Sequence, residues 1–134
     1  MSTSPEESAR AAAEALIDAF ASHDRERYFS SFSADASFIF HNVPVMLESR
    51  AAYEALWAEW EREGFRVRSC VSEGAEVRMR GAEVAIFTHR VTTELEGVPE
   101  PSRERETIVL ERQADGTWLG VHEHLSPLPA ESEQ

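Results

Sequence analysis

The sequence contains no lysine, because all 13 basic residues among its 134 are arginines. This absence excludes Schiff-base catalysis by lysine and the phosphate-binding lysine of nucleotide-binding loops. The sequence also lacks a Gly-x-Gly-x-x-Gly motif, which argues against a dinucleotide-binding fold. A formal net charge of −12 disfavours nucleic acid and membrane partners, since the phosphates of nucleic acids and anionic membrane surfaces would repel the protein.

Cysteine and long apolar runs are equally scarce. The single cysteine, Cys70, cannot form a disulfide within the chain or build a cysteine-rich zinc site. It lies in a strand-like segment, where we interpret it as a small packing residue and not as a nucleophile. No apolar run is long enough to span a membrane, and the polar, acidic N-terminus does not resemble a secretory signal. These features predict a cytoplasmic protein.

The length fits a single domain over residues 1–134 with one hydrophobic core. We expect an ordered core over 5–127. Residues 128–134 are rich in proline and glutamate and are expected to fray.

Apolar residues at helical spacing predict helices over about 5–22 and 50–63, with a short helix after Asp24. Period-two patterns predict the strands, near residues 36–40, 65–80, 83–96, 103–113 and 117–126. This order predicts an α+β fold, in which three N-terminal helices pack on one face of a strongly curved antiparallel sheet. A curved sheet closed by helices encloses a pocket, where small-molecule sites usually lie.

The segment from Asp115 to Ser126, DGTWLGVHEHLS, resembles the last strand of SnoaL-like domains in the nuclear transport factor 2-like superfamily, which includes ketosteroid isomerase-like proteins. It is especially similar to the association domain of calcium/calmodulin-dependent protein kinase II. The segments 90–92 and 97–99 are also similar to that domain. The resemblance implies the cone-shaped fold of the superfamily, but it does not choose among isomerases, cyclases, dehydratases, binding modules and assembly domains.

The kinase association domain lines its pocket with several arginines, and only Arg90 matches one of them. The other two positions are Ile108 and Leu125, so binding of the same anionic ligands is not implied. Alternation along the strands, with Arg90 taken as a pocket residue, places Glu123 on the pocket face. A buried carboxylate is costly unless paired, so Arg90 is its expected partner, with Glu106 as a competitor. A single β-bulge would reverse part of this assignment.

Two sets of residues follow from this assignment. The predicted pocket lining, besides Arg90 and Glu123, is Tyr53, Trp57, Phe40, Ile86, Thr88, Glu106, Ile108, Val121 and Leu125. The outer face is predicted to form a dimer interface through Trp118, His122, His124 and His89.

Three residues are candidates for catalysis. Glu123 could act as general base or acid if its pKa is raised, Arg90 could hold a carboxylate or enolate, and His41 could move protons at the pocket mouth. The alternatives are a Glu123–Arg90 ion pair that only orders the sheet and a surface histidine at position 41. His122 and His124 could chelate a metal together with His89 or His41, but the same spacing is structural in the kinase association domain, and we predict no metal.

The leading hypothesis is a homodimeric pocket protein that binds a small, largely apolar organic molecule with a polar or acidic group. If it is an enzyme, we expect a cofactor-independent isomerase, cyclase or dehydratase that moves a proton next to a carbonyl. One alternative is a non-catalytic ligand-binding or oligomerisation module. Another is a histidine-based metal-binding protein.

Overall fold

The computed structural model describes residues 3–129, so most of the predicted frayed tail, from residue 130 on, lies outside the described residues. Within this part of the chain the helices are α1 (Pro5–Ala21), α2 (Arg25–Ser30) and α3 (Arg50–Arg62). The strands are β1 (Phe32–Phe40), β2 (Val67–Arg80), β3 (Val84–Leu95), β4 (Ser102–Arg112) and β5 (Trp118–Pro127). No helix in residues 3–129 is long and apolar enough to cross a membrane.

The helices begin at residues that satisfy their free backbone N–H groups. Ser4 and Glu7 form a reciprocal capping box at α1, with each side-chain oxygen 3.1 Å from the other residue's backbone nitrogen. Ser49 caps α3 by accepting a hydrogen bond from the backbone N–H of Ala52 at 3.1 Å. These caps fix where α1 and α3 start, and the buried residues at helical spacing mark their inward faces.

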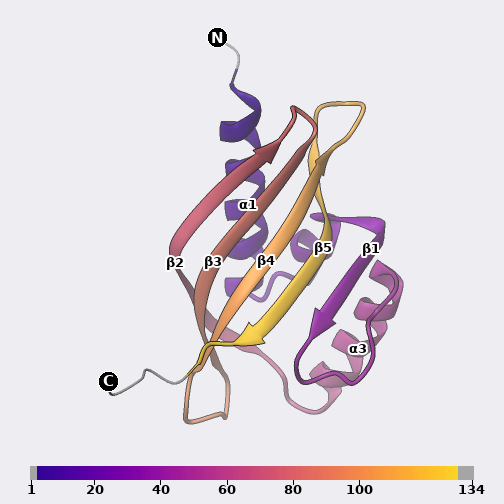
Figure 1. Cartoon of the computed structure of the whole chain (residues 1–134). Coiled ribbons are helices and arrows are strands. Elements are labelled where there is room, and N and C mark those ends of the chain that lie inside the picture. Colours follow the sequence, from indigo (N-terminus) through magenta and orange to yellow (C-terminus); the bar gives the residue numbers. More distant parts are fainter. Residues whose placement is uncertain (1–2, 130–134) are drawn as a thin grey trace.

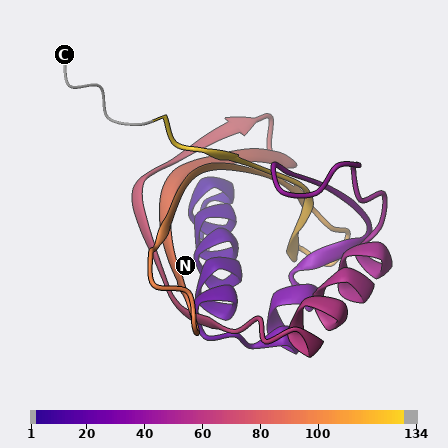
Figure 2. The same cartoon turned by 90° about the horizontal axis from the view of Figure 1, so that it is seen from below.

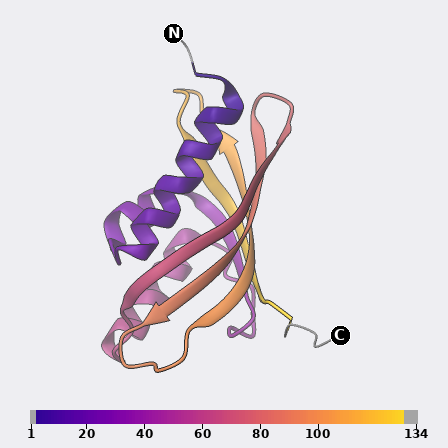
Figure 3. The same ribbon diagram turned by 90° about the vertical axis from the view of Figure 1, so that its left-hand side faces the viewer.

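The five strands form one sheet in the order β1-β5-β4-β3-β2. Strands β2 to β5 pair antiparallel, whereas β1 joins the edge beside β5 in parallel. The sheet is strongly curved and wraps partly around α1, with α3 at the other side of the opening (Figure 2). In the side view, α1 runs along the concave face of the sheet (Figure 3). The predicted α+β fold with helices on one face of a curved sheet is confirmed.

A β-bulge in β5 decides which of its side chains face inward. Val109 pairs with His122 and Leu110 pairs with Gly120, so Val121 is an extra residue in the ladder. Trp118 therefore faces the concave side before the bulge, and later residues of β5 are shifted by one position. Gly120 is required at this place, because a Cβ there would lie 2.8 Å from the ring of the buried Phe32.

The core is an aromatic cluster between α2, α3 and β1. Its members are all less than 5% exposed: Tyr28, Phe29, Phe32, Phe38, Tyr53 and Trp57. Tyr28 packs against four of the others with ring centroids 5.2–5.9 Å apart. This packing fixes α2 and α3 against the sheet and holds two tyrosine hydroxyls in the interior.

Candidate functional site

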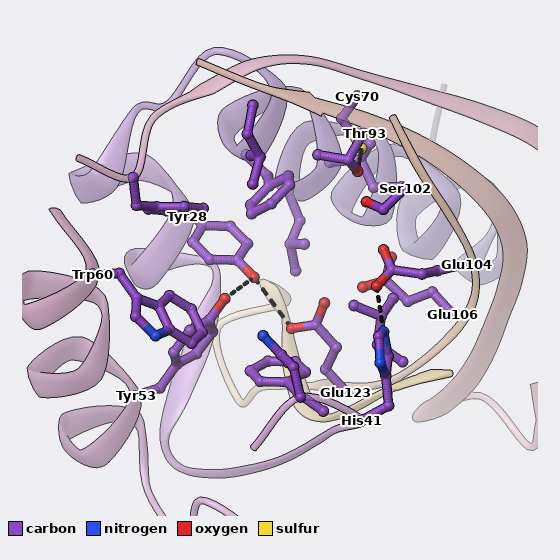
Figure 4. Close-up of a pocket in the computed structure, with 18 residues that line it drawn as sticks. Tyr28, His41, Tyr53, Trp60, Cys70, Thr93, Ser102, Glu104, Glu106 and Glu123 are labelled. Carbon is purple, nitrogen blue, oxygen red and sulfur yellow. Dashed lines mark hydrogen bonds and ion pairs between the residues drawn. The ribbon is translucent and has the colours of Figure 1, made fainter. Parts of the chain in front are cut away.

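A cavity of about 250 Å³ lies between the concave face of the sheet and the helices (Figure 4). Most of its wall is apolar, from Leu16, Ile17, Phe20, Phe40, Trp60, Phe65, Leu95 and Leu125. Exposed lining residues mark its mouth, and these are His41, Asn42 and Ser102. The polar groups deep inside the cavity are few, which is typical of a site for a small organic molecule.

Two glutamates, Glu106 and Glu123, lie beside each other in the cavity wall (Figure 4). Glu123 on β5 pairs in register with Ile108 on β4. Glu106 lies two residues before Ile108 on β4, so its side chain is on the same face of the sheet as those of Ile108 and Glu123. Only 8% of Glu106 and 4% of Glu123 is exposed, and each carboxyl alters the pKa of the other. Two ionised carboxylates buried side by side would repel each other, so we infer that one of the two carries a proton.

We assign this proton to Glu123, whose pKa is raised more. Burial raises the pKa of Glu123 well above its ordinary value of 4.5, and the neighbouring charge of Glu106 raises it further. Burial also raises the pKa of Glu106, but its interaction with Glu123 opposes that rise. Two like charges so close in a desolvated site do not both ionise near neutral pH. The pair therefore carries one negative charge, on Glu106.

The hydroxyl of Tyr28 on α2 contacts Glu123, and the hydroxyl of Tyr53 on α3 contacts that of Tyr28. Tyr28 donates to Oε1 of Glu123 at 3.2 Å, and the hydroxyls of Tyr28 and Tyr53 lie 2.9 Å apart. Because the one hydroxyl proton of Tyr28 goes to Glu123, Tyr53 is the donor to Tyr28. Burial, and then the neighbouring Glu123, raises the pKa of both tyrosines well above 10.0. Both phenols are therefore protonated donors at neutral pH.

On the opposite side, His89 from β3 contacts Glu106. Its Nε2 lies 2.6 Å from Oε1 of Glu106, and its Nδ1 lies 2.6 Å from Oγ of Ser72 on β2. Burial lowers the pKa of His89 to about 4, so the ring is neutral at neutral pH. We assign its proton to Nε2, which faces the negative charge of Glu106, and Ser72 then donates to Nδ1.

At the mouth, Nε2 of His41 lies 2.6 Å from Oε2 of Glu104 (Figure 4). His41 thus lies where it was predicted to be, beside the opening, but it contacts a carboxylate that is separate from the buried pair. Cys70 also lines the cavity, and burial raises the pKa of its thiol to about 11. Cys70 is therefore a neutral packing group and not a thiolate nucleophile.

Arg90 lies on the opposite face of the sheet, so the predicted Arg90–Glu123 pair is wrong. On β3 the inward side chains include Phe87 and His89, and the exposed Arg90 alternates with them. The Arg90 guanidinium packs over Gly74, with Nη1 2.8 Å from the place of a Cβ on that glycine. Among the described residues, those lining the cavity include no arginine, so an acidic ligand group loses its expected partner.

The other predicted lining residues fall into three groups. Those that line the cavity are Tyr53, Phe40, Glu106 and Leu125. Those buried in the core outside the cavity lining are Trp57 and Ile108. Those that do not reach the cavity are Ile86, Thr88 and Val121. The prediction for this last group is wrong. The side chains of Ile86 and Thr88 lie on the outer face of the sheet together with that of Arg90, and Val121 is the bulged residue of β5.

Two residues of the predicted dimer interface are also misplaced. Trp118 and His89 are 5% and 4% exposed and lie on the concave face, so neither can contact a second subunit across the outer face. His122 and His124 do lie on the outer face, where Nδ1 of His122 is 2.8 Å from Oγ of Ser37. The prediction of a homodimer itself stays a prediction.

Neither histidine proposed as the third metal ligand lies beside His122 and His124. The two rings lie 6.3 Å apart, and His89 lies on the other face of the sheet, where it contacts Glu106. His41 lies at the cavity mouth, where it contacts Glu104. Within residues 3–129, no group of three or more histidine, cysteine, aspartate or glutamate residues is placed to hold a metal ion.

Comparison with known families places the chain among proteins of this architecture. The sequence profile of the SnoaL-like domain matches residues 9–131, which is nearly the whole length. The chain belongs to the SnoaL-like domain family. A search among curated proteins finds no match to this SnoaL-like domain.

Solved structures share the fold of this SnoaL-like domain. A ketosteroid isomerase-like protein from Erwinia carotovora atroseptica has a TM-score of 0.79 at 20% identity, covering 92% of this chain and 95% of that one. A nuclear transport factor 2-like protein of unknown function from Pseudomonas putida has a TM-score of 0.77 at 22% identity, covering 100% of this chain and 94% of that one. ActVI-ORFA from Streptomyces coelicolor has a TM-score of 0.68 at 18% identity, covering 88% of this chain and 92% of that one. These similarities establish the fold, but they do not identify the chemistry, which has to be inferred from the residues of the site.

Sequence analysis missed two members of the buried site. Tyr28 lies in the predicted short helix after Asp24, but it was not identified as the hydrogen-bond partner of Glu123. The available signal was its hydroxyl, since a buried tyrosine usually needs a partner for that group. His89 was placed on the wrong face, although its neighbours Phe87 and Val91 are both apolar and mark the buried side of β3.

The buried pair predicts a distinct pH dependence of stability. The folded-state pKa of Glu123 lies above its unfolded value near 4.5, so its contribution to stability is complete below that pH and is lost as pH rises toward the folded-state pKa. His89 has the opposite effect between about pH 4 and 6.5, because its folded-state pKa is lowered. Above pH 6.5 we therefore expect the free energy of unfolding to fall, by up to about 1.4 kcal/mol per pH unit.

Urea denaturation from pH 5 to 9 measures this slope, with Glu123→Gln as the matched variant. The variant should show a smaller fall above pH 6.5, because glutamine does not ionise. Other titratable groups that face the pair are common to both proteins: Tyr28, Tyr53, Cys70, His89 and Glu104. Equal slopes for the two proteins would contradict the raised pKa of Glu123.

Proposed function

We propose that this domain binds a small, uncharged, largely apolar organic molecule with a carbonyl group and moves a proton on it through the Glu106–Glu123 pair. One observation carries the proposal: two buried carboxyls, Glu106 and Glu123, lie on neighbouring strands in the wall of a largely apolar cavity, where each raises the cost of ionising the other. Environments that hold one carboxyl protonated beside an ionised one supply both an acid and a base at neutral pH.

The proposed chemistry needs only groups of this chain. The negatively charged pair, with its charge on Glu106, takes a proton from the carbon next to the carbonyl, and the C–H electron pair becomes part of an enolate. The protonated phenols of Tyr28 and Tyr53 line the same cavity, and one of them would donate to the enolate oxygen by turning away from its present partner. Return of a proton from the pair to another carbon of the conjugated system completes an isomerisation and restores the single negative charge.

The cavity also limits the class of substrate. Its volume of about 250 Å³ lies just below the range of about 300–1,000 Å³ that is common for sites of drug-sized ligands, so the guest is small. Three carboxyl groups line it, from Glu104, Glu106 and Glu123, and the cationic partner expected from the sequence is absent from the lining formed by the described residues. A carboxylate ligand would be repelled and desolvated without a partner. This supports a neutral ligand over the acidic one considered earlier.

A matched pair of probes tests this selectivity. We expect 3-cyclohexen-1-one, a neutral β,γ-unsaturated ketone, to bind and to be converted into 2-cyclohexen-1-one. The anion 3-cyclohexene-1-carboxylate has a similar ring and should bind at least about tenfold more weakly, which corresponds to about 1.4 kcal/mol. Calorimetry or ligand-observed NMR measures binding, and absorbance of the conjugated product measures turnover. Tighter binding of the carboxylate would contradict the proposed substrate class.

Binding of the ketone without conversion would instead support the non-catalytic ligand-binding module. A self-association role is compatible with either result, because the outer face of β3, β4 and β5 is separate from the cavity. We keep the homodimer as part of the proposal, with His122 and His124 on the face available to a second copy.

A further inference from the structure

A row of polar side chains crosses the concave face of the sheet, from the helices to the edge strand. In order these are Tyr53, Tyr28, Glu123, Glu106, His89 and Ser72. We call this set the polar row. Glu123, Glu106, His89 and Ser72 come from the four neighbouring strands β5, β4, β3 and β2, which are drawn side by side in Figure 1. Buried polar groups on an otherwise apolar sheet face are costly, so such a continuous set needs an explanation.

The two ends of the polar row lie in different environments. Tyr53, Tyr28, Glu123 and Glu106 line the cavity, whereas His89 and Ser72 do not. The His89 side chain is completely buried, and Ser72 is exposed on the edge strand. The row therefore joins the cavity interior to solvent at a place distinct from the mouth at His41 and Asn42.

We propose that His89 and Ser72 form a proton path that connects the Glu106–Glu123 pair to solvent at the edge of the sheet while a ligand fills the cavity. The proposal rests on the proposed function only in assigning the pair a proton to exchange. A ligand in the cavity blocks the route through the mouth, and this second route stays open because it runs behind the cavity wall.

The contacts allow a balanced proton transfer in both directions. Inward, the Nε2 proton of His89 moves to the Glu106 carboxylate, Ser72 gives its hydroxyl proton to Nδ1, and Ser72 takes a proton from water. Outward, the same steps run in reverse, and a proton from Glu106 reaches water. The two transfers within the protein each span a contact of 2.6 Å, between Glu106 and His89 and between His89 and Ser72, and the exchange with water takes place at the exposed Ser72. The neutral imidazole keeps one proton throughout and only changes the nitrogen that carries it.

The variant His89→Gln separates a proton path from a purely structural role. A glutamine amide can donate to Glu106 and accept from Ser72, as the neutral imidazole does, but it cannot pass a proton from one atom to the other. A structural role predicts that glutamine restores wild-type behaviour. A proton path predicts that it does not, while Ser72→Thr, which keeps a hydroxyl, does.

The first readout uses 3-cyclohexen-1-one labelled with deuterium at C2. In the wild type, we expect the deuterium taken up by the Glu106–Glu123 pair to be lost largely to water. In His89→Gln we expect it to be returned to C4 of the product, so that deuterium retention per turnover is several-fold higher than in the wild type. Ser72→Ala should also raise retention, and Ser72→Thr should resemble the wild type. Equal retention in wild type and His89→Gln would overturn the proposed path.

The second readout does not depend on turnover. The cavity is filled with cyclohexanone, which cannot isomerise, the protein is mixed rapidly into D₂O, and infrared spectroscopy follows the isotope shift of the protonated Glu123 carboxyl. We expect a several-fold slower shift in His89→Gln than in the wild type. Equal rates would overturn the path even if the protein is an enzyme. A slower shift without any conversion of the labelled ketone would support the path and reject the proposed catalysis.

Discussion

Glu106→Gln should lower kcat for isomerisation of 3-cyclohexen-1-one by about 10²–10⁴-fold, the range typical for removal of a general acid–base group. Glutamine has nearly the same size and can still hydrogen-bond to His89, but it cannot accept a proton from carbon. Binding of the ketone should change much less than kcat, because the cavity wall is retained. Steady-state kinetics and calorimetry on the same preparation measure the two effects.

Arg90→Gln is the matched control for this experiment. Arg90 lies on the outer face and outside the cavity lining, so its variant should keep the wild-type kcat. The control also tests the interpretation that sequence analysis favoured, in which Arg90 holds the enolate. A loss in Arg90→Gln as large as that in Glu106→Gln would contradict the site described here.

Trp57→Ala should lower the free energy of unfolding by about 3–5 kcal/mol, as large-to-small changes of buried aromatic residues do. Trp57 is completely buried and packs against Tyr28, Phe29 and Phe65 with ring centroids 4.9–5.4 Å apart. Its Nε1 also donates to Oε2 of Glu61 at 2.8 Å, and the variant loses this bond. Urea denaturation followed by circular dichroism measures the change.

Trp60→Ala on the same helix is the comparison. Trp60 is only partly buried and lines the cavity, so less packing is lost, and the space created opens toward a cavity that already exists. We expect a clearly smaller loss of stability there. If both variants lose the same free energy, the aromatic cluster around Trp57 is not the main support of α3.

The fold could be predicted closely because its elements have strong local patterns. The predicted strand 83–96 corresponds to β3 at Val84–Leu95, and the predicted helix 50–63 corresponds to α3 at Arg50–Arg62. The first strand was predicted too short, because residues 33–35 resemble a turn, whereas β1 begins at Phe32 and has an irregularity before Ser37. The parallel pairing of β1 with β5 was not predicted, since no local pattern records which edge a strand joins.

The site could be predicted only in part. Glu123 was assigned to the cavity by strand alternation with Arg90 taken as a pocket residue, and Glu106 was considered as a competitor for the pairing. Arg90 was assigned to the same face from a family resemblance, although simple alternation on β3 places it opposite the buried Phe87 and His89. The bulge at Val121 then let Trp118 and Glu123 face the same side, which strict alternation forbids.

The central claim is that Glu106 and Glu123 hold a single proton between them inside the cavity at neutral pH. Infrared difference spectroscopy of the wild type against Glu123→Gln at pH 7 tests it directly, because a protonated carboxyl has a carbonyl stretch that ionised carboxylates lack. We predict one such band in the wild type and its loss in Glu123→Gln. A wild-type spectrum with only carboxylate bands at pH 7 would contradict the claim and the functions built on it.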